Sequence, residues 1–329
     1  MADPLALLAD VLATVLPRVV EITVLIALGV TFADLLVSLG AVRAVAALSR
    51  PLTGTANLPE EVGTAILTTA ASTTAGYGML AEFRESGRLD DRATLVAVTV
   101  NTFFGFVQHV FTFYAPVLVP ILGLRVGLLY VGARALVALA ITLTGVLAGA
   151  LMLSERNVDP SASVAVEADG AGGAASLGAT LRDAVESGLS KTRDVVPRLL
   201  LVYTAVVLLT RVVDLQAATA GATPLATVTG LPAAAVPVVA VFAVDTTNGA
   251  FVIAPLVRDG AFTARQAVAT MLVGGIVSFA VSTFKRSIPF QYGIWGAEFG
   301  SKVVAVNTAL KVGWIALAVV VVLHAPLPL

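Results

Sequence analysis

The chain has 329 residues, of which 58% are hydrophobic and 12% are charged, and its formal net charge is −1. A mean hydropathy of +0.95 excludes an ordinary water-soluble globule, and the near-neutral charge argues against a nucleic-acid partner. The sequence has no cysteine and two histidines, which excludes thiolate sites and argues against an all-protein metal centre, so neither a metal nor another cofactor is predicted.

Six stretches are long and apolar enough to cross a hydrocarbon layer of about 30 Å as helices. Because no water satisfies peptide groups in lipid, and the stretches lack period-two alternation, helices are predicted rather than barrel strands. They lie at residues 19–39, 93–115, 128–153, 199–215, 266–284 and 303–323. Residues 5–16 and 181–196 predict amphipathic helices at the membrane surface. We therefore predict an all-α, multi-pass protein of the cell membrane, with the lipid bilayer as a partner.

The second half of the sequence resembles the first when the two are aligned without a gap from Leu58-Pro59 on Leu231-Pro232, an alignment that also brings Gly76 onto Gly249. Because the matched residues are mostly Gly, Pro and Thr, which shape a backbone, we predict two tandem, pseudo-symmetric copies of one structural unit. The predicted domains are a first transmembrane repeat at 1–153, a flexible polar linker at 154–176 and a second transmembrane repeat at 177–329.

Each predicted repeat contains a segment that begins with Leu-Pro, at residues 58–83 and 231–257. Each segment is compatible with a full span or with a re-entrant helical hairpin. If both segments span, each repeat has four crossings and the repeats are parallel; if both re-enter, each repeat has three spanning helices and the repeats are inverted. The second arrangement divides the basic residues more unequally between the two sides, so the positive-inside rule favours inverted repeats.

The centres of both segments carry small polar residues. At membrane depth such runs are tolerated only when they are buried in protein or line a wet cavity, where hydroxyl, amide and freed backbone groups bind a polar solute. The alternative is helix packing, since small residues let helices approach closely. Asp245 favours a binding role, because a carboxylate in a span is costly. The candidates are Thr73, Thr74 and Gly76 in one segment and Asp245, Thr246, Thr247, Asn248 and Gly249 in the other.

A polar stripe follows the first segment. Asn101, Gly105, His109 and Thr112 are spaced by four, four and three residues, which places them on one helix face, and Gln108 lies beside it. The stripe predicts either an interior cavity or hydrogen bonds between helices. A histidine changes its charge near neutral pH, so His109 is a candidate proton relay as well as a packing residue.

Two cations, Arg134 and Lys311, lie inside predicted spans, and Asn307 aligns with Arg134. One interpretation is ion pairing with Asp245 and Glu21 within the bundle. The other is contact with an anionic or carbonyl-bearing substrate. Because the sequence has no P-loop, nucleophile elbow, His-Glu-x-x-His or dinucleotide motif, no enzyme activity and no catalytic residue are predicted.

The run from Leu58-Pro59 through Thr73-Thr74-Ala75-Gly76-Tyr77-Gly78 to Leu80, with the polar-striped helix that follows, resembles the nucleoside recognition, or Gate, domain. That domain occurs in concentrative nucleoside transporters, ferrous-iron transporter B and spore maturation proteins A and B. Two such units resemble a fusion of the two spore maturation proteins, or an archaeal membrane protein with the same domain. The resemblance covers residues 58–140 and, more weakly, 231–315.

The resemblance implies secondary transport of a small, nucleoside-like solute, with re-entrant hairpins and inverted repeats. It places the two polar runs at the hairpin tips. The chain departs from the iron transporter in lacking cysteine and an attached GTPase, and it lacks the glutamate-bearing hairpin of nucleoside transporters.

We therefore predict a transporter or permease for a small polar solute, which binds at mid-membrane between the two Thr-rich segments. A coupling ion, H⁺ or Na⁺, and assembly into a homo-oligomer are compatible with this class. The alternative is a non-transporting scaffold or regulatory component of the membrane, in which the polar residues serve helix packing.

Overall fold

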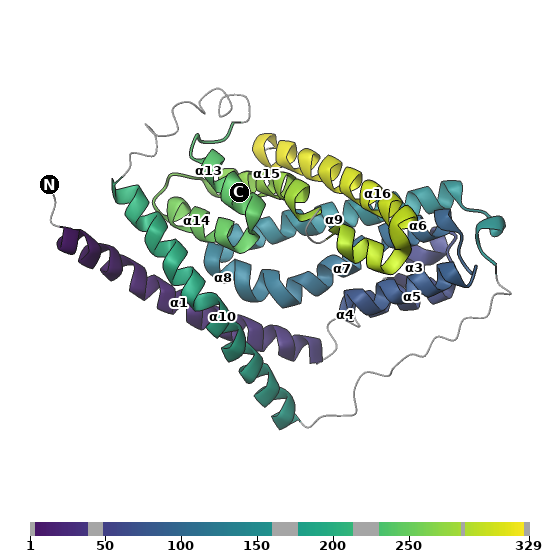
Figure 1. Ribbon diagram of the computed structural model, residues 1–329, viewed down its shortest axis with the longest axis horizontal. Helices are drawn as coiled ribbons and strands as arrows, with labels where there is room; N and C mark the ends of the chain where they lie inside the picture. Colours follow the sequence, from purple (N-terminus) through teal and green to yellow (C-terminus); the bar gives the residue numbers. More distant parts are fainter. Residues whose placement is uncertain (1–3, 39–48, 160–176, 213–229, 284–286, 326–329) are drawn as a thin grey trace.

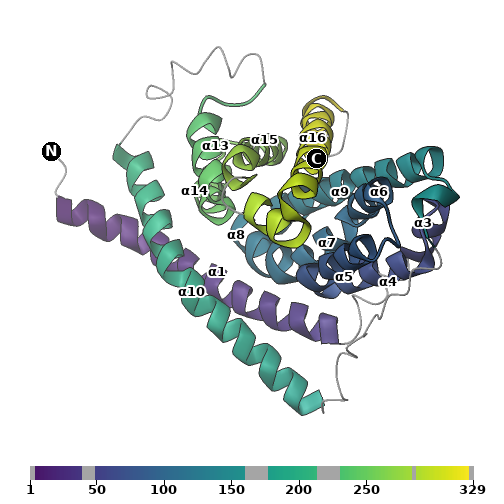
Figure 2. The same ribbon diagram turned by 45° about the vertical axis from the view of Figure 1, so that its right-hand side comes forward.

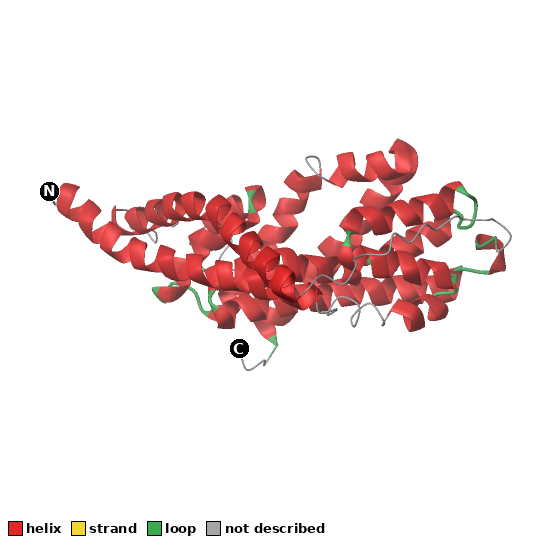
Figure 3. Cartoon of the chain, turned by 90° about the horizontal axis from the view of Figure 1, so that it is seen from below, coloured by secondary structure: helices red, strands yellow, loops and turns green. Residues whose placement is uncertain are grey.

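The computed structural model describes residues 4–38, 49–159, 177–212, 230–283 and 287–325. About 89% of the structure is helical. Within the described ranges there is no strand, only an isolated bridge between Leu89 and Val158 (Figure 3). The predicted all-α class is confirmed.

The first half of the chain contains α1 (Pro4–Ser38), α3 (Ser49–Thr55), α4 (Glu60–Ala71), α5 (Thr73–Glu85), α6 (Asp91–Val100), α7 (Thr102–His109), the π-helix η1 (Val110–Leu118), α8 (Val119–Leu122) and α9 (Leu124–Met152). The second half contains α10 (Leu177–Val212), α13 (Ala235–Val244), α14 (Thr246–Arg258), α15 (Ala264–Ser282) and α16 (Ile288–His324) (Figure 1). Gly296, with φ 72°, interrupts α16 and divides it into two helical parts at a kink.

Among the residues that the structure describes, four stretches are long and apolar enough to cross a membrane: Leu8–Phe32, Asp91–Leu122, Leu124–Met152 and Ile288–His324. They overlap four of the six predicted spans. The other two predictions fall on α10 and α15, and each ends in residues outside the described ranges, at 213–215 and 284. Large apolar side chains on the long helices face outward, as Leu136 and Leu151 do, with exposed fractions of 68% and 76%. These features indicate a membrane protein.

The helices α1 and α10 pack against each other along one side of the molecule (Figures 1 and 2). Their 35 and 36 residues, at about 1.5 Å per residue, make each about 53 Å long. Each continues through an internal proline, Pro17 or Pro197. The prediction of separate surface helices at 5–16 and 181–196 is therefore wrong about where these helices end, because both stretches are continuous with the apolar helix that follows.

Both Leu-Pro segments are broken helices. The break falls at Ser72, with φ −144° and ψ 109°, and at Asp245, with φ −151° and ψ 123°. Each side chain caps the next helix: Ser72 Oγ accepts from the Ala75 amide at 3.3 Å and Asp245 Oδ1 from the Asn248 amide at 2.8 Å. The resulting helices have at most 13 residues, or about 20 Å, which is too short to cross a hydrocarbon layer alone.

A glycine allows each broken helix to fold back on itself. A Cβ at Gly76 would lie 2.6 Å from the Ala65 carbonyl oxygen, and a Cβ at Gly249 would lie 2.6 Å from Phe242 Cα. Only a residue without a side chain permits α5 to approach α4, or α14 to approach α13, this closely. Each segment is thus a pair of short helices packed against each other.

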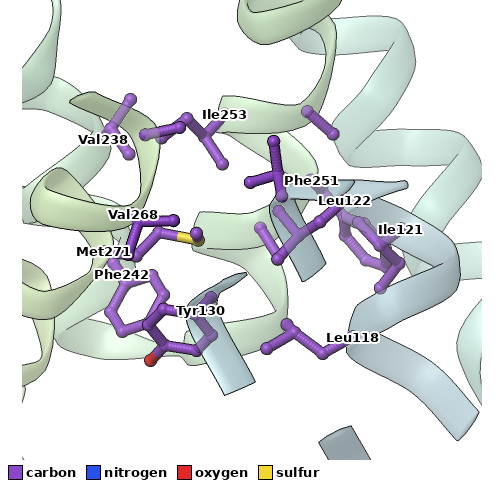
Figure 4. Close-up of a cluster of buried hydrophobic side chains, with 14 of the residues drawn as sticks. Leu118, Ile121, Leu122, Tyr130, Val238, Phe242, Phe251, Ile253, Val268 and Met271 are labelled. Atoms are coloured by element: carbon purple, nitrogen blue, oxygen red, sulfur yellow. The ribbon is translucent and has the colours of Figure 1, made fainter. Parts of the chain in front are cut away.

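The buried apolar side chains form two clusters, and each mixes the two halves of the chain. One joins α1, η1 and the start of α9 to α10 and α13–α15; Figure 4 shows Tyr130 of α9 beside Phe242 of α13 within it, with ring centroids 6.3 Å apart. The other joins α3–α7 and the end of α9 to Trp295, Phe299 and Val303 of α16. The halves are therefore interleaved, and α9 belongs to both clusters.

The predicted linker is described in part. Residues 154–159, which include the short 3₁₀ turn η2 (Glu155–Asn157), are held to the loop before α6. Asn157 Nδ2 donates to Asp90 Oδ2 at 2.6 Å and Arg88 Nη1 to the Asp159 carbonyl at 2.8 Å. Residues 160–176 lie outside the described ranges.

Candidate functional site

A cavity of about 210 Å³ lies between α5, α6, α7, η1 and α9 of the first half and α16 of the second. A dry cavity of about 150 Å³ holds benzene in another protein, so this one has room for a solute somewhat larger than a six-membered ring. Its polar wall includes Thr73, Asn101, His109, Arg134, Asn307 and Lys311. Five of these six were predicted as site residues from the sequence, and the structure brings them together.

The long helices α9 and α16 contribute aligned positions to the cavity. Arg134 and Ala138 line it from α9, and Asn307 and Lys311 line it from α16. In the alignment of the two halves, Arg134 matches Asn307 and Ala138 matches Lys311. One member of each pair is a cation and the other is neutral, so each long helix supplies one cation. In the alignment of the two halves, the two cations are offset by about one helical turn.

Arg134 lies ten residues after the start of α9, about 15 Å along the helix. Its buried Nε has no hydrogen-bond partner. The guanidinium interacts electrostatically with the phenols of Tyr114 and Tyr130, and its Nη1 would be 3.7 Å from a Cβ at Gly275 of α15. The Arg134 side chain therefore reaches from the first half of the chain to the second.

Lys311 places its Nζ over the ring of Phe279, 5.9 Å from the centroid. It lies within electrostatic range of Arg134, and His109 lies within range of both cations. His109 shares a hydrogen bond of 2.8 Å with Gln108, so that predicted residue supports the wall. No carboxylate is among the electrostatic neighbours found for these three basic groups in the described part of the chain.

Glu21 therefore does not form the ion pair with Arg134 or Lys311 that was one interpretation of the sequence. Glu21 pairs with Arg18, one turn before it on α1, at 2.6 Å. Asp245 caps α14. Among the described residues no group of three or more His, Asp or Glu is placed to hold a metal ion.

The neutral wall of the cavity has buried polar atoms without partners. Asn101 Nδ2 donates to Thr69 Oγ1 at 2.9 Å, but Asn101 Oδ1 has no partner, and neither does Thr73 Oγ1. Buried polar groups are rarely left unsatisfied, so these two atoms indicate a place for a solute or for water.

Sequence reasoning missed Tyr77, Tyr114 and Asn307 as lining residues. Tyr114 reaches the cavity from the π-helix η1, which contains Pro116. Proline lacks the amide that an α-helix needs, and π-helical turns often occur at functional sites. Pro116 within an apolar run was the available signal, and Asn307 could have been found from its alignment with Arg134.

The second polar run lies elsewhere. Residues 245–249 do not line this cavity. The Asn248 Oδ1 atom is buried without a partner, Thr246 and Thr247 are half-buried, and Gly249 packs on Phe242. This run connects to the cavity through a chain of ring contacts, since Phe242 contacts Tyr130 edge to face and Tyr130 contacts Tyr114, with 6.2 Å between the tyrosine centroids. In the first run, Thr74 is exposed and Gly76 serves the hairpin contact.

Comparison with known proteins gives two similar chains from the archaeon Methanocaldococcus jannaschii. Uncharacterized protein MJ0880 is 22% identical over 307 residues, which cover 91% of this chain and 95% of that protein. Uncharacterized protein MJ0871 is 26% identical over 241 residues, which cover 73% of this chain and 72% of that protein. No protein-family model and no solved structure matches the chain.

Proposed function

We propose that this chain is a multi-pass transporter or permease of the cell membrane that binds a small polar solute in the cavity between α9 and α16. The observation that carries the proposal is a polar cavity at mid-length of two membrane-length helices, with a cation on each. A charged side chain at the centre of a bilayer costs about 2.5–3.5 kcal/mol on insertion scales, and such residues usually mark a substrate or ion pathway.

We further propose that the two halves are pseudo-symmetric repeats. Recurrence of backbone landmarks at aligned positions supports this. The helix breaks recur at Ser72 and Asp245, helix starts at Asp91 and Ala264, and left-handed glycines at Gly87 and Gly260 and at Gly123 and Gly296. Each apolar cluster contains residues of both copies, which is compatible with a solute site between the copies.

The proposed arrangement of the repeats is inverted. A hairpin that folds back returns the chain to the side from which it entered. Each repeat then crosses the membrane three times, and an odd number of crossings turns the second copy upside down. The close contacts at Gly76 and Gly249 support hairpins rather than straight spans.

The resemblance to the Gate domain adds nucleoside-like solutes to the candidates. We assign binding and passage to the site, with no catalytic residue. The competing role, a scaffold whose polar residues serve packing, has support from Thr69, Asn101 and Gly76, which do pack helices together. A test must therefore ask whether the cavity is open to water.

The natural absence of cysteine makes that test direct. Asn307→Cys places a thiol in the cavity wall, and Leu147→Cys, at a position 59% exposed on an apolar face of α9, is the matched control. We expect a charged, membrane-impermeant thiosulfonate to modify the Asn307→Cys variant in proteoliposomes and not the Leu147→Cys variant, because the thiolate reacts and does not form in lipid.

Transport by the same variant gives the second readout. Uptake of labelled uridine, 4-hydroxybenzoate or glycerol 3-phosphate should fall when the thiol of the Asn307→Cys variant is modified, because the added group fills the cavity. A thiol at this position that is unreactive from both sides of the membrane would favour the scaffold.

A further inference from the structure

We infer that the solute is a small oxyanion, a carboxylate or a phosphate ester, that also carries a hydrogen-bond donor; this rests on the proposed function. The first reason is charge. Every residue that lines the cavity is neutral or basic, and two of them, Arg134 and Lys311, are cations within electrostatic range of each other. His109 adds a third basic group at the same cavity.

Two cations held together inside a membrane are unfavourable unless an anion joins them, because each has lost water and each repels the other. Three acids of the membrane-length helices pair with other cations. Glu21 pairs with Arg18, Asp91 pairs with Arg84 at 2.8 Å and with Lys302 at 2.9 Å, and Glu298 of α16 lies 3.6 Å from Lys302. A bound anion is the group that would compensate Arg134 and Lys311.

The Nε atom of Arg134 indicates which anion fits. Its Nε is buried without a partner. The edge of a guanidinium that contains Nε presents two parallel N–H donors, whose spacing matches the two oxygens of a carboxylate or phosphate. Lys311 supplies a point charge from the facing helix, which suits the same oxyanion without demanding one orientation.

The neutral wall of the cavity, with Asn101 and Thr73, indicates a donor on the solute. Asn101 Nδ2 donates to Thr69, which leaves Asn101 Oδ1 without a partner, and an amide oxygen can only accept a hydrogen bond. A hydroxyl or amine would satisfy it, and Thr73 Oγ1 is available beside it as donor or acceptor. With about 210 Å³ of space, the solute is a hydroxy- or amino-substituted carboxylate or phosphate ester little larger than one ring.

Thermal unfolding of the full chain in detergent tests the inference with matched probes. 4-Hydroxybenzoate and 4-hydroxybenzamide differ in charge at nearly constant shape, as do glycerol 3-phosphate and glycerol. We expect at least one anion to raise the Tm while its neutral counterpart does not, since a ligand that binds only the folded state stabilises it. Whether the benzoate or the phosphate acts distinguishes carboxylate from phosphate.

Variants then locate the binding. Arg134→Gln and Lys311→Met should each weaken the anion by about tenfold or more, as expected for the loss of a charge-assisted hydrogen bond. Arg125→Gln removes an exposed cation from the same helix, outside the cavity, and should leave binding unchanged. Arg134→Lys keeps the charge without the fork and should retain part of the affinity. Without ligand, Arg134→Gln should melt at or above the wild type, because it removes a partly buried cation that has no carboxylate among its electrostatic neighbours.

Three results would overturn the inference: equal stabilisation by anions and their neutral counterparts, no stabilisation by either anion, or equal effects of Arg134→Gln and Arg125→Gln. The proposed function fails separately. If uridine is taken up and Arg134→Gln does not alter its uptake, the solute is neutral and the transporter stands. If the thiol of Asn307→Cys is unreactive from both sides, the transporter itself is refuted.

Discussion

In each half, the hairpin meets the helix that follows it, α6–α7 in the first half and α15 in the second, at three aligned positions, with opposite chemistry. In the first half the positions are Thr69, Gly76 and Asn101, and a hydrogen bond of 2.9 Å joins the Asn101 amide to Thr69. In the second half they are Phe242, Gly249 and Gly274, and the Phe242 ring fills the space between the two glycines. A Cβ at Gly274 would lie 2.9 Å from that ring.

The difference explains why the first segment lines the polar cavity and the second does not. The polar contact leaves an unpartnered oxygen on Asn101 and an unpartnered hydroxyl on Thr73 at the cavity wall. The aromatic contact buries the equivalent region, since Phe242 is 1% exposed. The first half therefore supplies the hydrogen-bonding wall and the second half the packing that supports it.

Of the substitutions that test this comparison, removal of the Phe242 ring should have the largest effect on stability. Phe242→Ala leaves an enclosed void against Gly249 and Gly274, and we expect the free energy of unfolding to fall by about 3–5 kcal/mol. Phe32→Ala is the matched control, because Phe32 is 61% exposed on α1 and its loss encloses no void. Thermal or denaturant unfolding in one detergent measures both. Equal losses in the two variants would show that the ring does not fill an enclosed space.

Substitutions of the glycines test the close approach of paired helices that the two hairpins share. Gly76→Ala and Gly249→Ala each force a methyl group against backbone atoms, and we expect each to cost about 1–3 kcal/mol. Gly78→Ala, in the same helix as Gly76, meets nothing within 4 Å and should be neutral or slightly stabilising. If all three variants unfold alike, the close approach of the paired helices is refuted.

Thr69 tests the polar side alone. Thr69→Val keeps the shape but removes the acceptor of the buried Asn101 amide, so we expect a loss of about 1–3 kcal/mol. Thr69→Ser retains the hydroxyl and serves as the control. Adding Asn101→Leu to Thr69→Val should recover part of the loss, because no buried donor then remains unpaired. Purely additive losses in unfolding measurements would contradict the hydrogen bond.

Substitutions of the two capping residues should have the smallest effect on the unfolding free energy. Ser72 and Asp245 hold the same position at the two breaks. Ser72→Ala and Asp245→Ala should each cost about 1 kcal/mol in unfolding free energy, with the charged cap at the upper end, and Asp245→Ser should cost only a few tenths. A cost for Asp245→Ser as large as that for Asp245→Ala would mean that Asp245 acts through its charge rather than as a cap.

Much of the architecture follows from local sequence. Long apolar runs predict the helices, whereas the small polar runs left a full span and a re-entrant hairpin as alternatives. The structure has a break in each run, where Ser72 or Asp245 caps the next helix. Arg134, Lys311, Asn101, His109 and Thr73 were all identified as candidates because polar residues are costly inside spans.

Which polar run lines the cavity was not predictable, because it depends on packing between distant residues. Phe242 looks like any apolar residue of its segment, and only Gly249 on the next helix and Gly274 on α15 make room for its ring. The predicted helix ends at residues 16 and 196, which lie within α1 and α10, were wrong for a different reason. Proline usually interrupts a helix, but each long helix continues through its proline while packed along the other.

The position of α9 limits how the molecule can rearrange. Beyond the cavity it is locked to the first half, where a Cβ at Gly145 would lie 2.9 Å from the Val100 amide nitrogen and Gly149 abuts Ala56. Before the cavity its Tyr130 packs on Phe242 of the second half. A helix of 29 residues fixed in both cores keeps them from separating. Relative motion of the cores would then be a rotation about α9, with Arg134 close to the pivot.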